Sequence, residues 1–200
     1  MLDPDSDPNE PQDDRPRAPA LADEVRRSLL KSRTVLIFGE ITSELAQATT
    51  AQLLALASES EAPIRIVIHS PGGHVESGDT IHDVIRFIRP EVTMIGSGWV
   101  ASAGALIFVA ARRENRIALP NTRFLLHQPS GGLRGAAADI EIEAVQIAAM
   151  RARLNRIFAA ATGQDLAKLT RETERNLWMS AREAQAYGLV HRVIESVEEV

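Results

Sequence analysis

Two short segments of this chain carry residues that could cooperate in nucleophilic catalysis. Ser102 stands among small residues, in the stretch Gly-Trp-Val-Ala-Ser-Ala-Gly-Ala, where a strand pattern gives way to an apolar helix pattern. His127 follows a short hydrophobic run at residues 122–126. A serine hydroxyl is a weak nucleophile until a positioned base takes its proton, and histidine, which titrates near neutral pH, suits that role. We therefore predict that Ser102 is a nucleophile and His127 its general base.

Each of these two residues also has a structural interpretation. A serine beside small residues is common where helices pack closely, and a histidine at a strand end often bonds to a backbone carbonyl. The catalytic interpretation gains weight only from the other motifs of the chain, which are described below.

The composition limits the classes of function that are open to the chain. It is 44% hydrophobic and 24% charged, as soluble globular proteins are, and its net charge of -5 argues against a broad nucleic-acid surface. Without cysteine there is no disulfide and no thiolate, and a cytoplasmic location is compatible with that absence. None of the histidines stands at a metal-ligand spacing, so we expect no metal and no cofactor. The longest apolar run, residues 99–111, is too short for a membrane span and predicts a buried helix.

Segments typical of buried strands alternate with segments typical of helices. The strand patterns fall at residues 34–38, 64–68, 91–95, 116–119, 122–127 and 190–194. The helix patterns fall at residues 21–31, 43–60, 77–87, just after Ser102, at 137–161, in a short stretch after Gly163, and from 179 onward. This alternation predicts an α/β fold in which helices cover a sheet.

The chain is expected to form a single folded domain over residues 20–196. Residues 1–19 are rich in Pro, Asp and Asn and are expected to be disordered, because they cannot bury enough apolar surface to offset the entropy of ordering. This acidic segment has no apolar core, so it is predicted to be neither a secretory signal nor a transit peptide.

Several motifs, in order, resemble those of ClpP, the proteolytic subunit of the Clp protease. The turn His69-Ser70-Pro71-Gly72-Gly73 resembles the family's Asn-Ser-Pro-Gly-Gly turn, residues 98–104 its nucleophile segment, and residues 127–129 its histidine segment. Thr-Gly-Gln at 162–164 and the stretch 179–189 resemble its C-terminal signature. The resemblance covers roughly residues 29–194.

The resemblance implies a ClpP/crotonase-like α/β fold with a helical handle, here at about residues 133–162. Subunits of this family form seven-membered rings that stack face to face around a proteolytic chamber. The chain is therefore expected to be a Clp-type serine endopeptidase subunit that acts on peptides or unfolded proteins. A homo-oligomer of stacked heptameric rings is expected, with a ring that includes a paralogous subunit as the alternative.

The resemblance also assigns further site residues. The backbone N–H groups of Gly73 and Ala103 are expected to form the oxyanion hole, and losing one such donor typically lowers the rate by about 10²–10³. Residues 73–75 and 129–132 are expected to present strand edges between which a substrate peptide adds as an extra strand. The residues expected to contact substrate are Gly72, His74, Ser130 and Gly131.

The third member of the expected triad departs from the family pattern. The family has Asp-Arg-Asp or Glu-Arg-Asp here, whereas this chain reads Glu174-Arg175-Asn176, which places Asn176 on the catalytic aspartate. An asparagine oxygen can orient the histidine but cannot offset the charge of an imidazolium. In a serine protease the corresponding change lowers kcat by about 10⁴, or about 5.4 kcal/mol. We expect slow turnover; Glu172 and Glu174 are the nearby carboxylates, but neither matches the expected position.

Two alternatives to a weakened peptidase remain. A structural or regulatory ring subunit that cleaves little is favoured by Asn176 and by Arg65, which stands with Val67 where the family has aromatic residues for docking the ATPase. A Clp ATPase is accordingly a candidate partner only. A crotonase-like acyl-CoA enzyme shares the fold, but the chain lacks the acids and the CoA-binding loop that it needs. Labelling of Ser102 by a serine-directed phosphonate separates the three.

Overall fold

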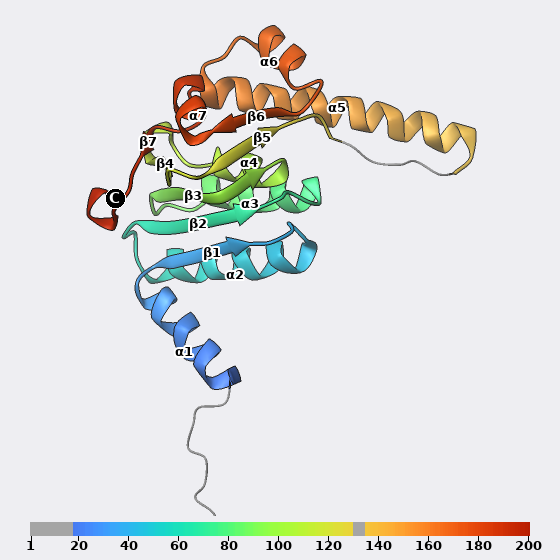
Figure 1. Cartoon of the computed structure of the whole chain (residues 1–200). Helices are drawn as coiled ribbons and strands as arrows, with labels where there is room; N and C mark the ends of the chain where they lie inside the picture. Colours follow the sequence, from blue (N-terminus) through green and yellow to red (C-terminus); the bar gives the residue numbers. More distant parts are fainter. Residues whose placement is uncertain (1–17, 130–134) are drawn as a thin grey trace, which may run out of the picture.

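The computed structural model describes residues 18–129 and 135–200, which form one seven-stranded sheet with helices packed on it (Figure 1). The strands are β1 (Thr34–Phe38), β2 (Ile64–Ser70), β3 (Val92–Ala101), β4 (Arg116–Ala118), β5 (Arg123–Leu126), β6 (Leu177–Ser180) and β7 (Arg192–Val193). The helices are α1 (Ala18–Lys31), α2 (Ser43–Glu59), α3 (Val75–Phe87), α4 (Ala103–Phe108), α5 (Ala137–Thr162), α6 (Leu166–Glu172) and α7 (Ala181–Tyr187), with 3-10 turns η1 (Arg113–Asn115) and η2 (Val197–Glu199). The expected α/β architecture is confirmed.

The sheet is mostly parallel. Strands β1, β2, β3, β4 and β7 are neighbours in that order and run parallel. Strand β4 pairs with residues 94–96 of β3, and β5 pairs in parallel with residues 99–101 of the same strand. Strand β6 then pairs antiparallel with β5. The C-terminal ends of β3 and β5 therefore lie side by side, and these ends lead to Ser102 and His127.

One face of the sheet is covered and the other is open. Burial alternates along β2, where Ile64, Ile66 and Ile68 are fully buried beneath the helices and the residues between them are only partly buried. The open face carries exposed aromatic residues, among them Trp99 and Trp178, whose rings stack with centroids 5.8 Å apart.

Three segments differ from the sequence prediction. The apolar run that starts at Trp99 was predicted as a helix, but residues 99–101 complete β3 and α4 begins only at Ala103; a short apolar run does not by itself distinguish a buried strand from a buried helix. Strand β6 was missed, because only four residues form it and Trp178 in it is exposed. Helix α1 begins at Ala18, two residues inside the segment expected to be disordered, and Pro19 suits a first helical turn.

Helix α5 extends well beyond the rest of the domain (Figure 1). Its C-terminal half packs on the body through Leu154 and Phe158, whereas Ile142 and Val145 in its N-terminal half are each 60% exposed. It ends at Gly163 in the left-handed conformation, as the Thr-Gly signal predicts. The helix predicted at residues 137–161 is thus present and projects from the domain, whereas residues 133–134 of the expected handle lie outside the described residues. No helix in residues 18–129 or 135–200 combines the length and apolar character of a membrane span.

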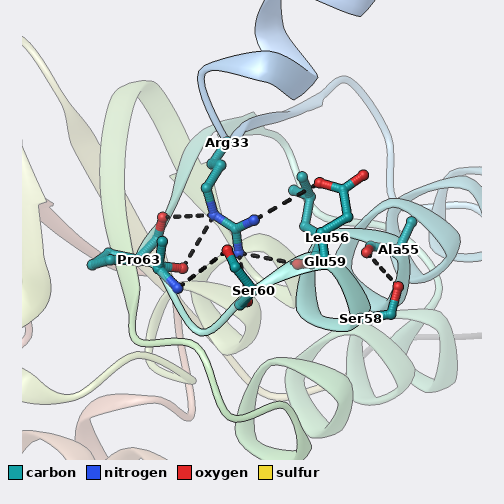
Figure 2. A network of polar contacts seen from close by, with 8 residues as sticks. Arg33, Ala55, Leu56, Ser58, Glu59, Ser60 and Pro63 are labelled. Carbon is teal, nitrogen blue, oxygen red and sulfur yellow. Dashed lines mark hydrogen bonds and ion pairs between the residues drawn. The ribbon is translucent and has the colours of Figure 1, made fainter.

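One arginine fastens the start of the sheet to the end of α2 (Figure 2). Arg33 Nη2 donates to the carbonyl oxygens of Leu56 at 3.1 Å and Ser60 at 3.2 Å, and its Nε donates to those of Ala62 and Pro63 at 3.1 and 3.3 Å. These carbonyls lie at or just after the C-terminus of α2; that of Leu56 also accepts from Ser60 N at 3.4 Å, whereas those that follow the helix have no N–H of a next turn available to them. A cation at this end of a helix is also favoured by the helix dipole.

Candidate active site

Ser102 occupies a strained turn between β3 and α4. Its φ of 54° and ψ of -120° lie where non-glycine residues rarely stand, and such a conformation costs about 1–3 kcal/mol. The surroundings hold it there: its N–H donates to Leu125 O at 2.9 Å, and its carbonyl accepts from Leu106 N at 3.1 Å. A sharp strand-to-helix turn of this kind exposes a nucleophilic serine in other hydrolases.

Gly72 leaves the space that the Ser102 side chain fills. A Cβ on Gly72 would lie 2.6 Å from Ser102 Cβ and 3.2 Å from its Oγ, and Gly72 has a φ of 102°. Both the space and the backbone conformation therefore require glycine here. The turn that contains Gly72 is brought against the nucleophile segment because β2 and β3 are neighbours in the sheet.

Ser102 and His127 line the same small cavity. This cavity, of about 20 Å³, is otherwise mostly apolar, with Val75 from α3 and Leu154 and Phe158 from α5 in its wall. Burial lowers the pKa of His127, so its imidazole is neutral near neutral pH and can accept a proton. The structure thus brings together the two residues that the sequence singled out. The contribution of α5 was not foreseen, although Leu154 and Phe158 stand four residues apart, as residues on one helix face do.

The two expected oxyanion donors have backbone N–H groups without an acceptor among the described residues. Ala103 is the first residue of α4, where the N–H has no partner within the helix. Gly73 forms a parallel bridge with Ile41, in which Ile41 N donates to Gly72 O and His74 N donates to Ile41 O, both at 2.8 Å. Because N–H groups alternate along an extended chain, the N–H of Gly73 itself faces away from Ile41.

Asn176 lies immediately before β6. The antiparallel register pairs Leu126 with Leu177, so the next pair along the two chains would be His127 and Asn176. Just beyond, Gln128 N donates to Thr173 O at 3.0 Å, so the two segments stay together but no longer in the register of β5 and β6. Asn176 is exposed, and no hydrogen bond joins it, His127 and Ser102 to one another within the described part of the chain.

The nearby carboxylates are engaged elsewhere. Glu172 Oε2 accepts a hydrogen bond from the hydroxyl of Tyr187 at 2.7 Å, and Glu174 Oε1 lies 3.6 Å from Arg151 Nη2. Burial and the bond to Glu172 raise the pKa of Tyr187 above its usual range. Neither carboxylate is bonded to His127 in the structure.

Of the other residues expected to contact substrate, the structure describes His74 but not Ser130 or Gly131. His74 is the N-cap residue of α3; its Nδ1 lies 2.8 Å from Ser77 Oγ and its Nε2 lies 3.1 Å from Glu76 Oε2, so its ring is held against the first turn of that helix. Ser130 and Gly131 lie outside the described residues. Within residues 18–129 and 135–200, no three histidine or acidic side chains gather closely enough to hold a metal ion.

A strained serine at the end of a parallel strand, with a neutral histidine in the same cavity, defines the class of serine hydrolases on an α/β scaffold. Comparison with known proteins agrees. The Clp protease family model matches residues 18–197. An ATP-dependent Clp protease proteolytic subunit 3 from Rhizobium johnstonii is 58% identical over 192 residues, which cover 96% of this chain and 99% of the relative. A proteolytic subunit 2 from Pseudomonas aeruginosa is 56% identical over 171 residues, 86% of this chain and 85% of the relative.

Solved structures show the same relationship. ClpP1 from Listeria monocytogenes matches with a TM-score of 0.79 and 50% identity, over 88% of this chain and 98% of the other. A mutant of that ClpP1, in which one asparagine is replaced by aspartate, matches with a TM-score of 0.82 and 51% identity, over 87% and 98% of the two chains. This chain therefore belongs to the Clp protease family: it is a proteolytic subunit of the ClpP type, a serine peptidase with the ClpP fold.

Proposed function

We propose that this chain cleaves peptide bonds through Ser102 and His127, at a rate limited by Asn176. The observation that carries the proposal is the shared cavity: Ser102, strained at the end of β3, and His127, with a pKa lowered by burial, lie in the wall of one small pocket. No other serine in the described chain has a positive φ.

The chemistry would proceed by acyl transfer in two stages. His127 takes the proton of Ser102 Oγ as the oxygen attacks the scissile carbonyl carbon, and the N–H groups of Gly73 and Ala103 stabilise the oxyanion. His127 then gives this proton to the leaving amine as the C–N bond breaks, which leaves an acyl-enzyme. A water molecule, deprotonated by His127, attacks the ester; the acid product leaves and Ser102 regains its proton.

Substrates would be peptides or unfolded proteins bound mostly through their main chain. Gly73 and His74 would form one side of the proposed peptide groove; the strand edge predicted over residues 73–75 is shorter than expected, because Val75 is already the first residue of α3. Residues 129–132 are proposed as the other side. Gly72 and His74 border the first edge, and Ser130 and Gly131 belong to the second. The apolar cavity beside Ser102, of about 20 Å³, would receive no more than a small apolar group of the substrate, such as a methyl, because Val75, Leu154 and Phe158 offer no polar partner there.

Asn176 would reduce the rate because it orients His127 without stabilising its charge. The pairing of Leu177 with Leu126 supports a position for Asn176 near His127, where its amide oxygen could accept the Nδ1–H of the ring. A neutral amide does not offset the imidazolium that forms in the transition state. A mutant of the similar ClpP1 in which one asparagine is replaced by aspartate keeps the fold, and an asparagine-to-aspartate exchange at position 176 can be tested in this chain.

We also propose that the active form is an assembly of stacked seven-membered rings. The projecting half of α5 carries Ile142 and Val145, and the open sheet face carries Trp99 and Trp178, all of them exposed in the isolated chain. Exposed apolar side chains that gather on one surface are typical of subunit contacts. A homo-oligomer is the first proposal, a ring shared with a paralogous subunit the second, and a Clp ATPase the candidate partner. The proposed location is the cytoplasm, with which the lack of cysteine is compatible.

A ring subunit that cleaves little is the second candidate function. It is favoured by a specific observation: no hydrogen bond connects Ser102, His127 and Asn176 among the described residues of the isolated chain. In this case the fold would serve assembly or regulation, and a partner subunit would supply most of the cleavage.

Phosphonate labelling combined with peptide hydrolysis tests the proposal. The purified oligomer is treated with a serine-directed fluorophosphonate, and hydrolysis of a fluorogenic peptide is followed in parallel. The proposal expects slow hydrolysis and labelling at Ser102, both lost in Ser102→Ala and both kept in Ser97→Ala, a matched serine on the same strand. An intact oligomer that is neither labelled nor active would instead support the second candidate. Labelling that persists in Ser102→Ala would exclude Ser102 as the nucleophile.

A further inference from the structure

A second, larger cavity lies apart from the catalytic pocket. It measures about 540 Å³ and is bounded by the last turns of α3, the end of α4, η1 and the C-terminal end of α5. It shares no lining residue with the cavity of Ser102 and His127.

The wall of this cavity is strongly cationic. Four arginines line it, together with His82, and none of its lining residues is acidic; the arginines are Arg86, Arg112, Arg113 and Arg116. Carboxylates stand only outside the lining. Glu91 Oε1 lies 3.9 Å from Arg112, and Asp83 Oδ1 lies 2.9 Å from Nδ1 of His82. Glu114 is next to Arg113 in η1. The lining is therefore not neutralised by acidic groups of its own.

Arg116 is the most unusual member of this set. It is only 1% exposed, and one of its nitrogens, Nη2, donates to Ala161 O at 2.7 Å at the end of α5. The other two, Nε and Nη1, have no hydrogen-bond partner among the described residues. Burial, together with repulsion from Arg113, lowers the pKa of Arg116 to about 10. The contact with α5 involves one nitrogen and leaves Nε and Nη1, which together carry three N–H donors of a buried cation, unsatisfied, which is costly.

An anion in the cavity would offset the positive charge of these arginines. The heads of Arg86, Arg112 and Arg113 are exposed and can reach a ligand directly, whereas Arg116 lies beneath them and contributes its charge from the floor. Guanidinium groups bind phosphate oxygens in pairs of parallel hydrogen bonds. The cavity volume is several times that of one phosphate, so it accommodates a chain of them.

We propose that this arginine-lined cavity is a binding site for an oligophosphate anion. The phosphates contact Arg86, Arg112 and Arg113, and their charge offsets that of Arg116. The ligand would also contact the C-terminal end of α4, the helix that follows Ser102, because Val109 and Ala111, just after α4, belong to the cavity wall. The site is independent of the peptidase chemistry and stands whether or not the chain cleaves peptides.

Calorimetric titration of the assembled protein with tripolyphosphate tests this site, in about 0.15 M salt so that exposed charges are screened. We expect saturable binding with one site per chain. Arg112→Ala/Arg113→Ala should weaken it at least about tenfold, because charge-assisted contacts are lost. Arg26→Ala/Arg89→Ala removes the same charge from exposed positions outside the cavity and should change the affinity less than about twofold.

Two results would overturn the proposal: no saturable binding at this salt concentration, or an equal loss of affinity in the two double variants. A parallel titration with ATP identifies the source of the phosphates. Tighter binding of ATP than of tripolyphosphate supports a nucleotide ligand, whose base contacts Ile157 and Ala160 in the wall. Equal or weaker binding of ATP supports a simple phosphate chain.

Discussion

Replacing Asn176 by aspartate would supply the charge that the proposed triad lacks. Asn176 directly precedes β6, whose first residue pairs with the residue before His127, and it is exposed, so a carboxylate there would lose little hydration. The exchange keeps the shape of the side chain and changes only its charge and hydrogen bonding. We expect Asn176→Asp to raise kcat for peptide hydrolysis while the oligomer stays intact.

The size of the gain follows from the solvent around residue 176. Two unit charges about 4 Å apart attract by about 1 kcal/mol in bulk water and about 4 kcal/mol near a protein surface. Applied to the imidazolium in the transition state, these limits correspond to an increase in rate between about 5-fold and about 10³-fold. The exposure of Asn176 places the expected gain below the roughly 10⁴-fold effect known for a buried triad aspartate.

The pH profile gives a second and independent signature. Burial lowers the pKa of His127, so in the native chain the catalytically competent neutral ring persists to lower pH than for an ordinary histidine. A carboxylate at position 176 stabilises the protonated ring and therefore raises that pKa. The acid limb of kcat/KM should accordingly move to higher pH in Asn176→Asp, whereas the rate on the plateau increases.

Steady-state hydrolysis of a fluorogenic peptide from about pH 5 to 9 measures both quantities. Asn121→Asp is the matched control, because it adds the same charge in an exposed turn before β5, at the end of that strand remote from His127. The reasoning is refuted if Asn176→Asp forms the same oligomer and remains as slow as the native chain. A faster variant whose acid limb does not move would show that residue 176 acts on something other than His127.

Three further substitutions test the site and the scaffold. Ser102→Gly should abolish hydrolysis yet be about 1 kcal/mol more stable to denaturant than Ser102→Ala, because glycine tolerates the φ of 54°; equal stability would contradict the strain argument. Gly72→Ala should lower kcat/KM at least about 100-fold, whereas Gly163→Ala, with a positive φ but no atom within 4 Å, should leave kcat/KM unchanged. Arg33→Ala should lower Tm by about 5–10 °C through loss of four carbonyl contacts, and an unchanged Tm would show that these contacts do not stabilise the fold.

The sequence predicted the elements of this fold better than it predicted their ends. β1 was predicted with its observed limits and the helix at 137–161 to within a residue, since each has a strong pattern and a clear stop signal. The predicted C-terminal limit of β3 was wrong. The run from Trp99 onward is largely apolar and fits either a strand or a helix, and only tertiary pairing with β5 decides that residues 99–101 are extended. Strand β6 has no pattern of its own and exists because β5 offers it an edge.

For the candidate site, the sequence singled out the residues and the structure adds how they meet. Ser102 and His127 were recognised by type and context, but their common cavity depends on β3 and β5 being neighbours, which no local pattern encodes. The wall contributed by α5 was missed for the same reason, since Leu154 and Phe158 read as ordinary core positions. The roles of Gly73, Ala103 and Asn176 remain predictions.

Helix α5 connects the two properties proposed here, cleavage and assembly. Its C-terminal half supplies Leu154 and Phe158 to the cavity beside Ser102, and its projecting half exposes Ile142 and Val145. The two halves belong to one continuous helix, so whatever fixes the projecting half also restricts the tilt of the half that forms the cavity wall. The apolar surface of the projecting half is not buried within the isolated domain. Its burial against another subunit would therefore stabilise the assembly and the substrate pocket together. This coupling gives a physical reason why hydrolysis should be compared between variants only at equal oligomeric state.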